Sequence, residues 1–146
     1  MQNGHAFLRP AFTLAEVALV LVIIGLTSLV GLRQVHLYLD RLATRNAVRA
    51  AGSVVARARD DAVALHTPVS VRIDTLSATL ELLSRTGPFG RVALGDAHGV
   101  ALSTTRDSIT FDVRGLGLGA ANLTLVARRG SASDTLVVSR LGRVRY

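Results

Sequence analysis

The chain has 146 residues, which is enough for one domain of ordinary size but not for two. Its 17 basic residues outnumber the 10 acidic ones and give a net charge of +7, and every basic residue is an arginine. With 49% hydrophobic residues, the chain is too apolar to be disordered. The absence of cysteine excludes disulfides, thiolate metal sites and a cysteine nucleophile.

Residues 12–32 are predicted to form a helix that crosses a membrane. Their only charged residue is Glu16, so the run from Val17 to Leu32 is entirely uncharged. As a helix, the 21 residues would be about 31 Å long, which matches the hydrocarbon core of a bilayer. The run is too long for the apolar core of a cleaved secretory signal. Its lack of charge disfavours the alternative, a buried helix of a soluble protein.

Residues 33–67 are predicted to continue the helix with one apolar side. The segment contains a single glycine, Gly52, and Pro68 disfavours helical geometry at Thr67, so the helix should end near His66. Apolar residues recur at three- and four-residue steps and form a stripe that we expect to pack on other elements. The stripe consists of Val35, Leu39, Leu42, Ala43, Ala47, Ala50, Val54, Ala58, Ala62 and Leu65. Another face carries three arginines that we expect to be solvated: Arg41, Arg45 and Arg49.

Residues 68–146 are predicted to form antiparallel β-structure. Apolar and polar residues alternate in five short segments, at 69–73, 80–82, 109–113, 123–125 and 136–138. Turn residues separate them at 74–78, 86–90, 95–99, 115–122 and 129–133. So small a region cannot bury much core alone, so the apolar stripe of the helix should complete it. We therefore predict an α+β fold in which a long N-terminal helix packs on a C-terminal domain of antiparallel sheet.

The N-terminus contains the sequence A-F-T-L-A-E-V at residues 11–17, directly before the apolar helix. This stretch resembles the prepilin signal of type IV pilins and type II secretion pseudopilins. In that family a membrane enzyme, the prepilin peptidase, cuts before the phenylalanine and methylates the new N-terminus. The resemblance implies a leader at residues 1–11 that is cut off between Ala11 and Phe12. The family usually has glycine where this chain has Ala11.

Glu16 is the one acidic residue of the apolar helix. A carboxylate inside a membrane is costly unless it is paired, so such a residue is functional by default. The alternative is that the helix dipole stabilises Glu16 while its side chain reaches the interface. The resemblance implies a role in assembly, in which Glu16 attracts the α-amino group that cleavage creates on Phe12 of a neighbouring subunit.

Charge distribution and resemblance predict opposite orientations in the membrane. One arginine, Arg9, precedes the apolar helix and several follow it, which by the positive-inside rule would place the C-terminal domain in the cytoplasm. The resemblance implies instead a single-span protein of the bacterial inner membrane, with its C-terminal domain on the periplasmic or outer side. It later becomes part of a pilus or pseudopilus. We follow the resemblance.

Three C-terminal segments resemble the GspH/FimT branch of minor pseudopilins. They read S-I-T-F-D-V-R-G at residues 108–115, L-T-L-V-A at 123–127 and T-L-V-V-S-R-L-G-R-V-R at 135–145. The resemblance implies a pilin-like minor subunit near the tip of a filament. Its partners would be other pilins or pseudopilins.

Residues 142–145 read G-R-V-R and match the G-R-x-R pattern with which FimT-type members bind DNA during uptake. In an extended strand, Arg143 and Arg145 project to one face and can bind phosphate oxygens without reading base sequence. The candidate DNA-binding residues are Gly142, Arg143, Arg145 and Arg140. Two more arginines would widen this surface if their strand lies beside it: Arg128 and Arg129. The alternative is that these arginines only keep an edge strand soluble.

The sequence does not indicate catalytic, cofactor or metal chemistry. The glycine-rich stretch 115–121 looks like a dinucleotide-binding turn, but a strand-like segment follows it and too few residues remain for a βαβ unit. The four histidines lie far apart, with no carboxylate at ligand spacing that would indicate a metal site. We therefore expect neither an enzyme nor a cofactor.

These observations favour a structural minor pseudopilin or minor pilin that serves a type II secretion pseudopilus or a type IV pilus. The domains would be a leader (1–11), a transmembrane helix half (12–32), an amphipathic helix half (33–67) and a β domain (68–146). The alternative is a minor pilin that binds DNA through its C-terminal arginines. A third hypothesis is a membrane-anchored domain that never assembles.

Overall fold

The structure, a computed structural model, describes residues 12–118 and 122–146, with the backbone alone at positions 29 and 30. The described chain divides into two compact units, one ending at His36 and the other running from Leu37 to Tyr146. The helices are α1 (Leu14–Ala64) and α2 (Leu94–His98). The strands are β1 (Val69–Asp74), β2 (Thr79–Ser84), β3 (Gly87–Ala93), β4 (Ala101–Thr104), β5 (Ser108–Phe111), β6 (Leu123–Arg129), β7 (Ala132–Val138) and β8 (Val144–Arg145).

The first unit consists of the N-terminal part of α1. The N–H of Glu16 donates to the Oγ1 of Thr13 (3.2 Å) and to the Thr13 carbonyl oxygen (3.1 Å), so Thr13 caps the helix. These two residues have the T-x-x-E spacing of a capping box. The described side chains of this unit are exposed, and α1 contains a stretch long and apolar enough to cross a membrane. This unit is therefore compatible with membrane anchoring.

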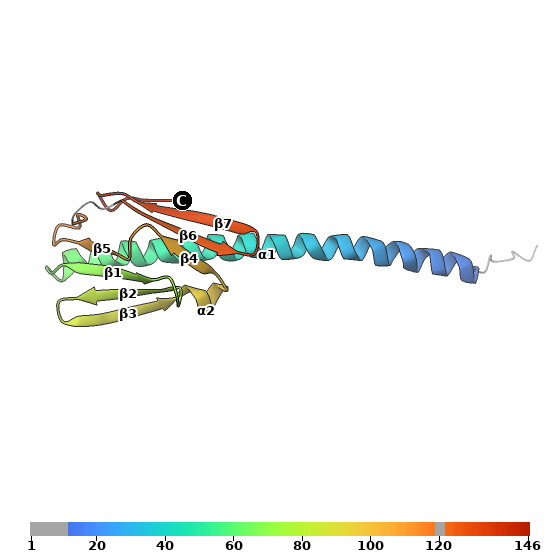
Figure 1. The fold of residues 1–146 in the computed structure, drawn as a ribbon, viewed down its shortest axis with the longest axis horizontal. Helices are drawn as coiled ribbons and strands as arrows, with labels where there is room; N and C mark the ends of the chain where they lie inside the picture. The colour runs from blue at the N-terminus through green and yellow to red at the C-terminus, as the bar shows by residue number, and fades with distance from the viewer. Residues whose placement is uncertain (1–11, 119–121) are drawn as a thin grey trace, which may run out of the picture. The chain divides into compact units, whose positions relative to one another are not determined.

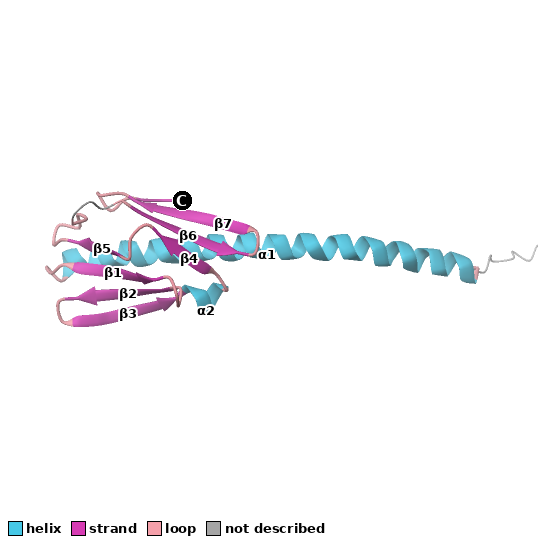
Figure 2. Cartoon of the chain, viewed as in Figure 1, coloured by secondary structure: helices cyan, strands magenta, loops and turns pink. Residues whose placement is uncertain are grey.

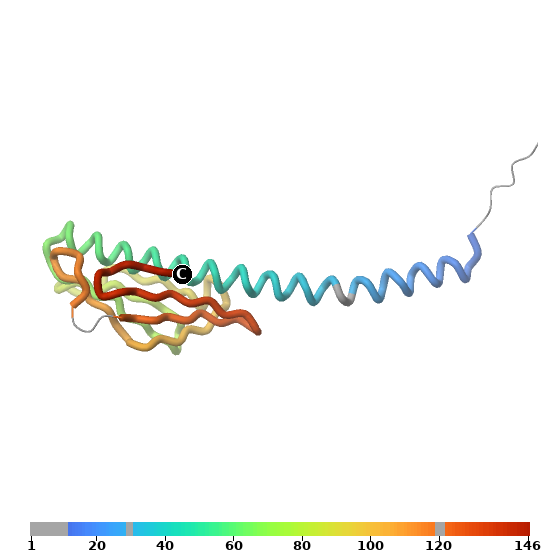
Figure 3. Tube along the Cα trace, turned by 90° about the horizontal axis from the view of Figure 1, so that it is seen from above, coloured from blue at the N-terminus to red at the C-terminus, as the bar shows by residue number. Residues whose placement is uncertain are grey.

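The second unit contains two antiparallel four-stranded sheets. The strand order is β3–β2–β1–β5 in the first sheet and β4–β6–β7–β8 in the second. Figures 1 and 2 show the two sheets next to each other along the part of α1 that belongs to this unit. Figure 3 shows both sheets on the same side of the helix. One helix and two sheets thus form two layers, and the predicted α+β fold is confirmed.

The hydrophobic core lies between α1 and the two sheets. The buried residues of the helix are small: Ala47, Val48, Ala51, Val54, Val55, Ala58 and Ala62. The sheets contribute larger side chains, among them Leu80, Leu82, Phe111, Leu123, Leu125 and Leu136. Small residues on the helix leave room for the large residues of the strands, so the two layers can pack closely.

The predicted apolar stripe is correct in the middle of the helix and wrong at its ends. Residues 47, 54, 58 and 62 are buried, whereas Val35, Leu39, Leu42 and Leu65 are exposed. The periodicity indicates which side of a helix is apolar but not how far the sheets extend along it. Val48 and Val55 were outside the stripe and are buried, because packing against two sheets requires a wider face than packing against one.

The sequence pattern also misplaced two turns. Residues 86–90, predicted as a turn, mostly belong to β3, an edge strand in which Pro88 is tolerated because one side of the strand needs no hydrogen bond. Residues 95–99, also predicted as a turn, form α2 and its cap. Gly99 has a φ of 62° and its N–H donates to the carbonyl oxygen of Gly95 (2.8 Å), which ends the helix. β4 was not predicted, because its sequence A-L-S-T contains one large apolar residue, Leu102, and so shows no alternation.

Candidate functional site

The residues predicted for processing and assembly lie at the N-terminus. Ala11 lies outside the described residues. Phe12 is 79% exposed and Glu16 is exposed one turn further along the helix. The backbone N–H of Glu16 is already bonded to Thr13, while its side chain faces outward from an apolar helix. A carboxylate in this position is available to a cation from outside the chain.

The G-R-V-R segment forms a tight turn and then a short strand. The N–H of Ser139 donates to the carbonyl oxygen of Arg143 (2.8 Å), and the N–H of Gly142 donates to the carbonyl oxygen of Ser139 (2.9 Å). The Ser139 hydroxyl also accepts the N–H of Arg143 at 3.2 Å. Beyond this turn β8 pairs with β7, with Arg145 opposite Val137. The segment is therefore the last hairpin of the second sheet.

Alternation along this hairpin separates the two arginines from the apolar residue between them. Val144 is half-buried and packs against the core, whereas Arg143 and Arg145 are exposed. Arg140 is exposed in the turn. Among the described residues, none of these three arginines is in an ion pair. The structure therefore places the three candidate arginines together, with their guanidinium groups available to an anion.

Gly142 is the one residue of this turn that must lack a side chain. Its φ is 72°, a left-handed conformation that L-residues adopt at a cost. A β-carbon there would lie 3.2 Å from Cε1 of the fully buried Phe111 and 3.3 Å from Cδ of Arg59. The glycine of the G-R-x-R pattern thus lets the turn pack tightly on the core and on α1.

The last segment of the chain, residues 142–146, lies along α1 between the levels of Arg59 and Gly52. At one end Gly142 contacts Arg59, and at the other end the ring of Tyr146 covers Gly52. Figure 3 shows this last segment running beside the helix. The stem of Arg59 is further held by the loop after β5, since a β-carbon on Gly115 would lie 3.1 Å from its Cγ and Nε. Arg59 and Gly52 were not predicted as site residues.

Arg128 and Arg129 do not widen the arginine surface. They lie on β6, which β7 separates from β8, and at the opposite end of the β6–β7 hairpin. Arg129 has a structural role instead: its Nε lies 3.1 Å from Oδ1 of Asp40 in α1, and its Nη1 donates to the carbonyl oxygen of His98 (2.7 Å). The side chain therefore joins the helix to the C-terminus of α2.

A groove of about 460 Å³ lies between the loop after β5 and the C-terminal turn. Its walls include Asp112, Arg114 and Arg140, together with exposed leucines at positions 116, 118 and 141. Asp112 organises the loop: its Oδ1 accepts the N–H of Leu116 (2.8 Å) and of Arg114 (2.9 Å). The Leu116 N–H lowers the pKa of Asp112 most.

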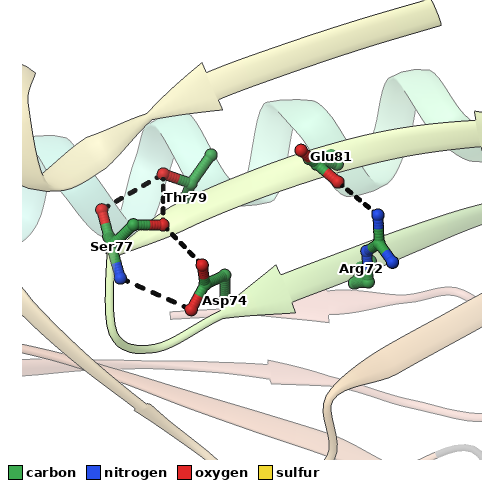
Figure 4. A network of polar contacts seen from close by, with 5 residues as sticks. All are labelled: Arg72, Asp74, Ser77, Thr79 and Glu81. Atoms are coloured by element: carbon green, nitrogen blue, oxygen red, sulfur yellow. Dashed lines mark hydrogen bonds and ion pairs between the residues drawn. The ribbon is translucent and has the colours of Figure 1, made fainter. Parts of the chain in front are cut away.

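A second polar cluster closes the β1–β2 hairpin (Figure 4). Oδ1 of Asp74 accepts the N–H of Leu76 (2.9 Å), and its Oδ2 accepts the hydroxyl of Ser77 (2.7 Å). The Ser77 hydroxyl contributes most to a lowered pKa of Asp74. Beside it, Arg72 pairs with Glu81 across the two strands at 2.7 Å. Each charged group drawn there already has a partner within the hairpin, so the cluster reads as a structural turn.

The described residues contain no group of three or more metal-ligating side chains. The glycine-rich stretch begins at Gly115 in a loop, with a φ of 72°, and residues 119–121 lie outside the described ones. Among the described residues, the next element after this stretch is the strand β6, whereas a dinucleotide-binding turn leads into a helix.

The fold is similar to that of solved pilin-like proteins. It matches the type IV minor pilin FimU of Pseudomonas aeruginosa with a TM-score of 0.61 and 16% identity, over 74% of this chain and 90% of that chain. It matches the minor pseudopilin EpsH from the type II secretion system of Vibrio cholerae with a TM-score of 0.57 and 13% identity, over 72% of this chain and 93% of that chain. No family model and no curated protein sequence matches the chain. The chain therefore has the pilin-like fold of minor pilins and minor pseudopilins.

Proposed function

We propose that the protein is a structural, non-catalytic minor subunit of a pilus or pseudopilus. The observation that carries this proposal is the combination of a pilin-like fold with an exposed apolar N-terminal stretch of α1, residues 14–32, in which the one acid is Glu16. The domain limits given by the sequence, with a leader at residues 1–11 and a membrane span at 12–32, complete the proposal. The β domain would lie on the periplasmic or outer side of the inner membrane.

In this function, prepilin peptidase removes the leader between Ala11 and Phe12. The new α-amino group of Phe12 then becomes the cation that pairs with Glu16 of a neighbouring subunit. Inside the membrane such a pair is favourable and an unpaired member is costly, so the pair would set the axial offset between subunits. Thr13 supports this role, because it bonds the backbone N–H of Glu16 and leaves the carboxylate free.

Two measurements test this proposal. Mass spectrometry of protein extracted from its native membranes should find chains that begin at Phe12. The variant Glu16→Ala should insert into the membrane at normal levels and be missing from sheared filaments, with Asp96→Ala, an exposed acid of α2, as the control. Intact chains that begin at Met1, or Glu16→Ala present in filaments at normal yield, would contradict the proposal.

A second candidate function is DNA binding by the C-terminal hairpin. The exposure of Arg143 and Arg145 on one side of β8, without an ion pair among the described residues, favours it. Two such guanidinium groups suit the phosphate backbone. The variant Arg143→Gln/Arg145→Gln, as the full-length protein in non-ionic detergent, should bind duplex DNA more weakly. The slope of log K against log salt should fall by about two, because each lost phosphate contact removes about 0.9. An unchanged slope would contradict DNA binding by this hairpin and would leave the structural role as its one proposed function.

A further inference from the structure

Three arginines of α1 lie along the edge of the helix that faces β7 and β8. Arg45, Gly52 and Arg59 follow one another at intervals of seven residues, close to two helical turns. Each therefore lies almost directly in line with the one before it along the helix, with a rotation of about 20° per interval. Arg41 lies about one turn before Arg45. It is 18 residues, or about five full turns, from Arg59, so Arg41 and Arg59 lie on the same side of the helix. The helix edge that carries these arginines is therefore continuous.

Contacts at three heights place this edge against the second sheet. Arg41 and Arg45 line a groove of about 350 Å³ together with residues 131–134, where the β6–β7 hairpin turns. Gly52 lies under Tyr146, and Arg59 contacts Gly142. The last segment runs from the level of Arg59, at Gly142, to that of Gly52, at Tyr146, so it lies beside the same edge. Its half-buried Val144 packs on the core, and the exposed Arg143 and Arg145 on either side of it face solvent.

We propose that the phosphate backbone of duplex DNA binds along this edge, and not only at the C-terminal hairpin. The surface, called here the arginine seam, consists of Arg41, Arg45, Arg59, Arg143 and Arg145. This inference rests on the second candidate function above and extends its site from one hairpin to a long face of the domain.

The charges of the arginine seam suit a long polyanion. All five side chains are exposed, and none is in an ion pair among the described residues, whereas Arg57 on the opposite side of α1 pairs with Asp61 at 3.5 Å. Asp134 in the groove beside Arg41 accepts the N–H of Thr135 (2.9 Å) and is the acid that reduces the positive field there.

The length of the arginine seam also suits DNA. The helix rises about 27 Å between Arg41 and Arg59, which corresponds to about eight base-pair steps of a duplex. A single anionic side chain or headgroup would need only one end of such a surface. Two exposed tyrosines lie near the arginine seam, Tyr38 one turn before Arg41 and Tyr146 over Gly52. They are about 14 helical positions apart, so they do not form a continuous platform on which successive bases stack, and the seam offers backbone contacts.

The experiment removes charge at the end of the arginine seam farthest from the G-R-V-R segment. The variant Arg41→Gln/Arg45→Gln is compared with Arg85→Gln/Arg106→Gln, which removes two exposed arginines from the loops before β3 and after β4. β3 belongs to the other sheet, and β4 is the strand farthest from β8 within its own sheet. Both are made in the full-length protein in non-ionic detergent, and circular dichroism checks that they fold. Affinity for a labelled duplex is measured across a salt series.

The seam variant should lower the salt slope by about two, and the control should leave it unchanged. A second pair isolates Arg59: Arg59→Gln should lower the slope by about one, while Arg57→Gln, two residues away on the opposite side of the helix, should not. Equal slopes for the seam and control variants would overturn the inference.

The outcomes separate this inference from the function on which it rests. If the unmodified protein binds duplex DNA without salt dependence or not at all, both fail. If Arg143→Gln/Arg145→Gln lowers the slope while Arg41→Gln/Arg45→Gln behaves like its control, the hairpin site stands and the extension to α1 fails. If the seam variant binds DNA normally but is lost from filaments, the seam is a contact between subunits and the inference is wrong.

Discussion

The ring of Tyr146 lies against Gly52 of α1 so closely that its hydroxyl fills the space a β-carbon would occupy. Glycine in the interior of a helix costs about 1 kcal/mol relative to alanine. Gly52 is nevertheless the one glycine in the part of α1 that packs on the sheets. The helix therefore gives up some stability where the C-terminal segment docks.

The first prediction concerns this contact. Gly52→Ala should displace the Tyr146 ring, because the phenol is the mobile end of an exposed side chain and moves more easily than the helix. The gain in helix propensity and the lost packing should nearly cancel, leaving the free energy of unfolding within about 1 kcal/mol. In the Tyr146→Ala background the same substitution should stabilise by about 1 kcal/mol. A double-mutant cycle by urea unfolding measures the difference, and additive effects would mean that the contact contributes nothing.

The second prediction compares two glycines with similar backbone strain. Gly142 and Gly99 have φ values of 72° and 62°, but the atoms near them differ. A β-carbon on Gly142 would lie 3.2 Å from the fully buried ring of Phe111, which has little room to shift, whereas one on Gly99 would meet only the guanidinium end of the Arg129 side chain. Each alanine should cost about 1 kcal/mol for the left-handed backbone. Gly142→Ala should cost about 1–3 kcal/mol more for overpacking, and thermal unfolding should separate the two variants.

The third prediction assigns Arg129 to stability rather than to binding. Arg129→Gln removes the ion pair with Asp40 and the bond to the His98 carbonyl. Since the Arg129 side chain is 42% exposed, solvent screens the pair and the loss should be about 1 kcal/mol. Arg128→Gln, on an exposed neighbour, should change stability by less than about 0.5 kcal/mol. Neither variant should alter the salt slope of DNA binding. A reduced slope for Arg129→Gln would mean that Arg129 contacts DNA and would contradict this prediction.

The fourth prediction concerns acid. Hydrogen bonds from Leu116 and Arg114 lower the pKa of Asp112 in the folded state below its unfolded value. Its stabilisation is therefore complete above the unfolded pKa, near pH 4, and is lost as the pH falls through the lower folded pKa. Asp112→Asn should flatten the loss of stability below pH 4, whereas Asp96→Asn, whose side chain accepts no hydrogen bond among the described residues, should not. The melting temperature measured from pH 6 to pH 2 checks this, and parallel curves for Asp112→Asn and the unmodified protein would contradict it.

The broad architecture could be predicted because it depends on periodicity. The change from three- and four-residue steps before Pro68 to two-residue alternation from Val69 onward marks the end of the helix and the start of the sheets. Elements without alternation escape such reasoning: β4 has one large apolar residue, Leu102, and the glycines and proline of β3 look like a turn although they form an edge strand.

The site could be predicted only where its residues are neighbours in sequence. The G-R-V-R pattern predicted that Arg143 and Arg145 share one face of an extended segment, and both are exposed on either side of the half-buried Val144, with Arg145 in β8 and Arg143 directly before it. The proximity of Arg59 to Gly142 is a contact between residues more than eighty positions apart, which only the packing of the last hairpin on α1 creates. The opposite error occurred with Arg129. The sequence suggested it as a further cation of the binding surface, but in the structure it pairs with Asp40 and stabilises the fold.

The brevity of β8 has a consequence for how the end of the chain behaves. β8 is held by two residues paired with β7, by the half-buried Val144 and by the contact of the Tyr146 ring with Gly52, whereas β7 pairs with β6 along seven residues. Local opening at such a place costs far less free energy than unfolding the domain. The last residues should therefore unfold and refold locally while the core stays intact. Their amide hydrogens should exchange with solvent well before those of β6.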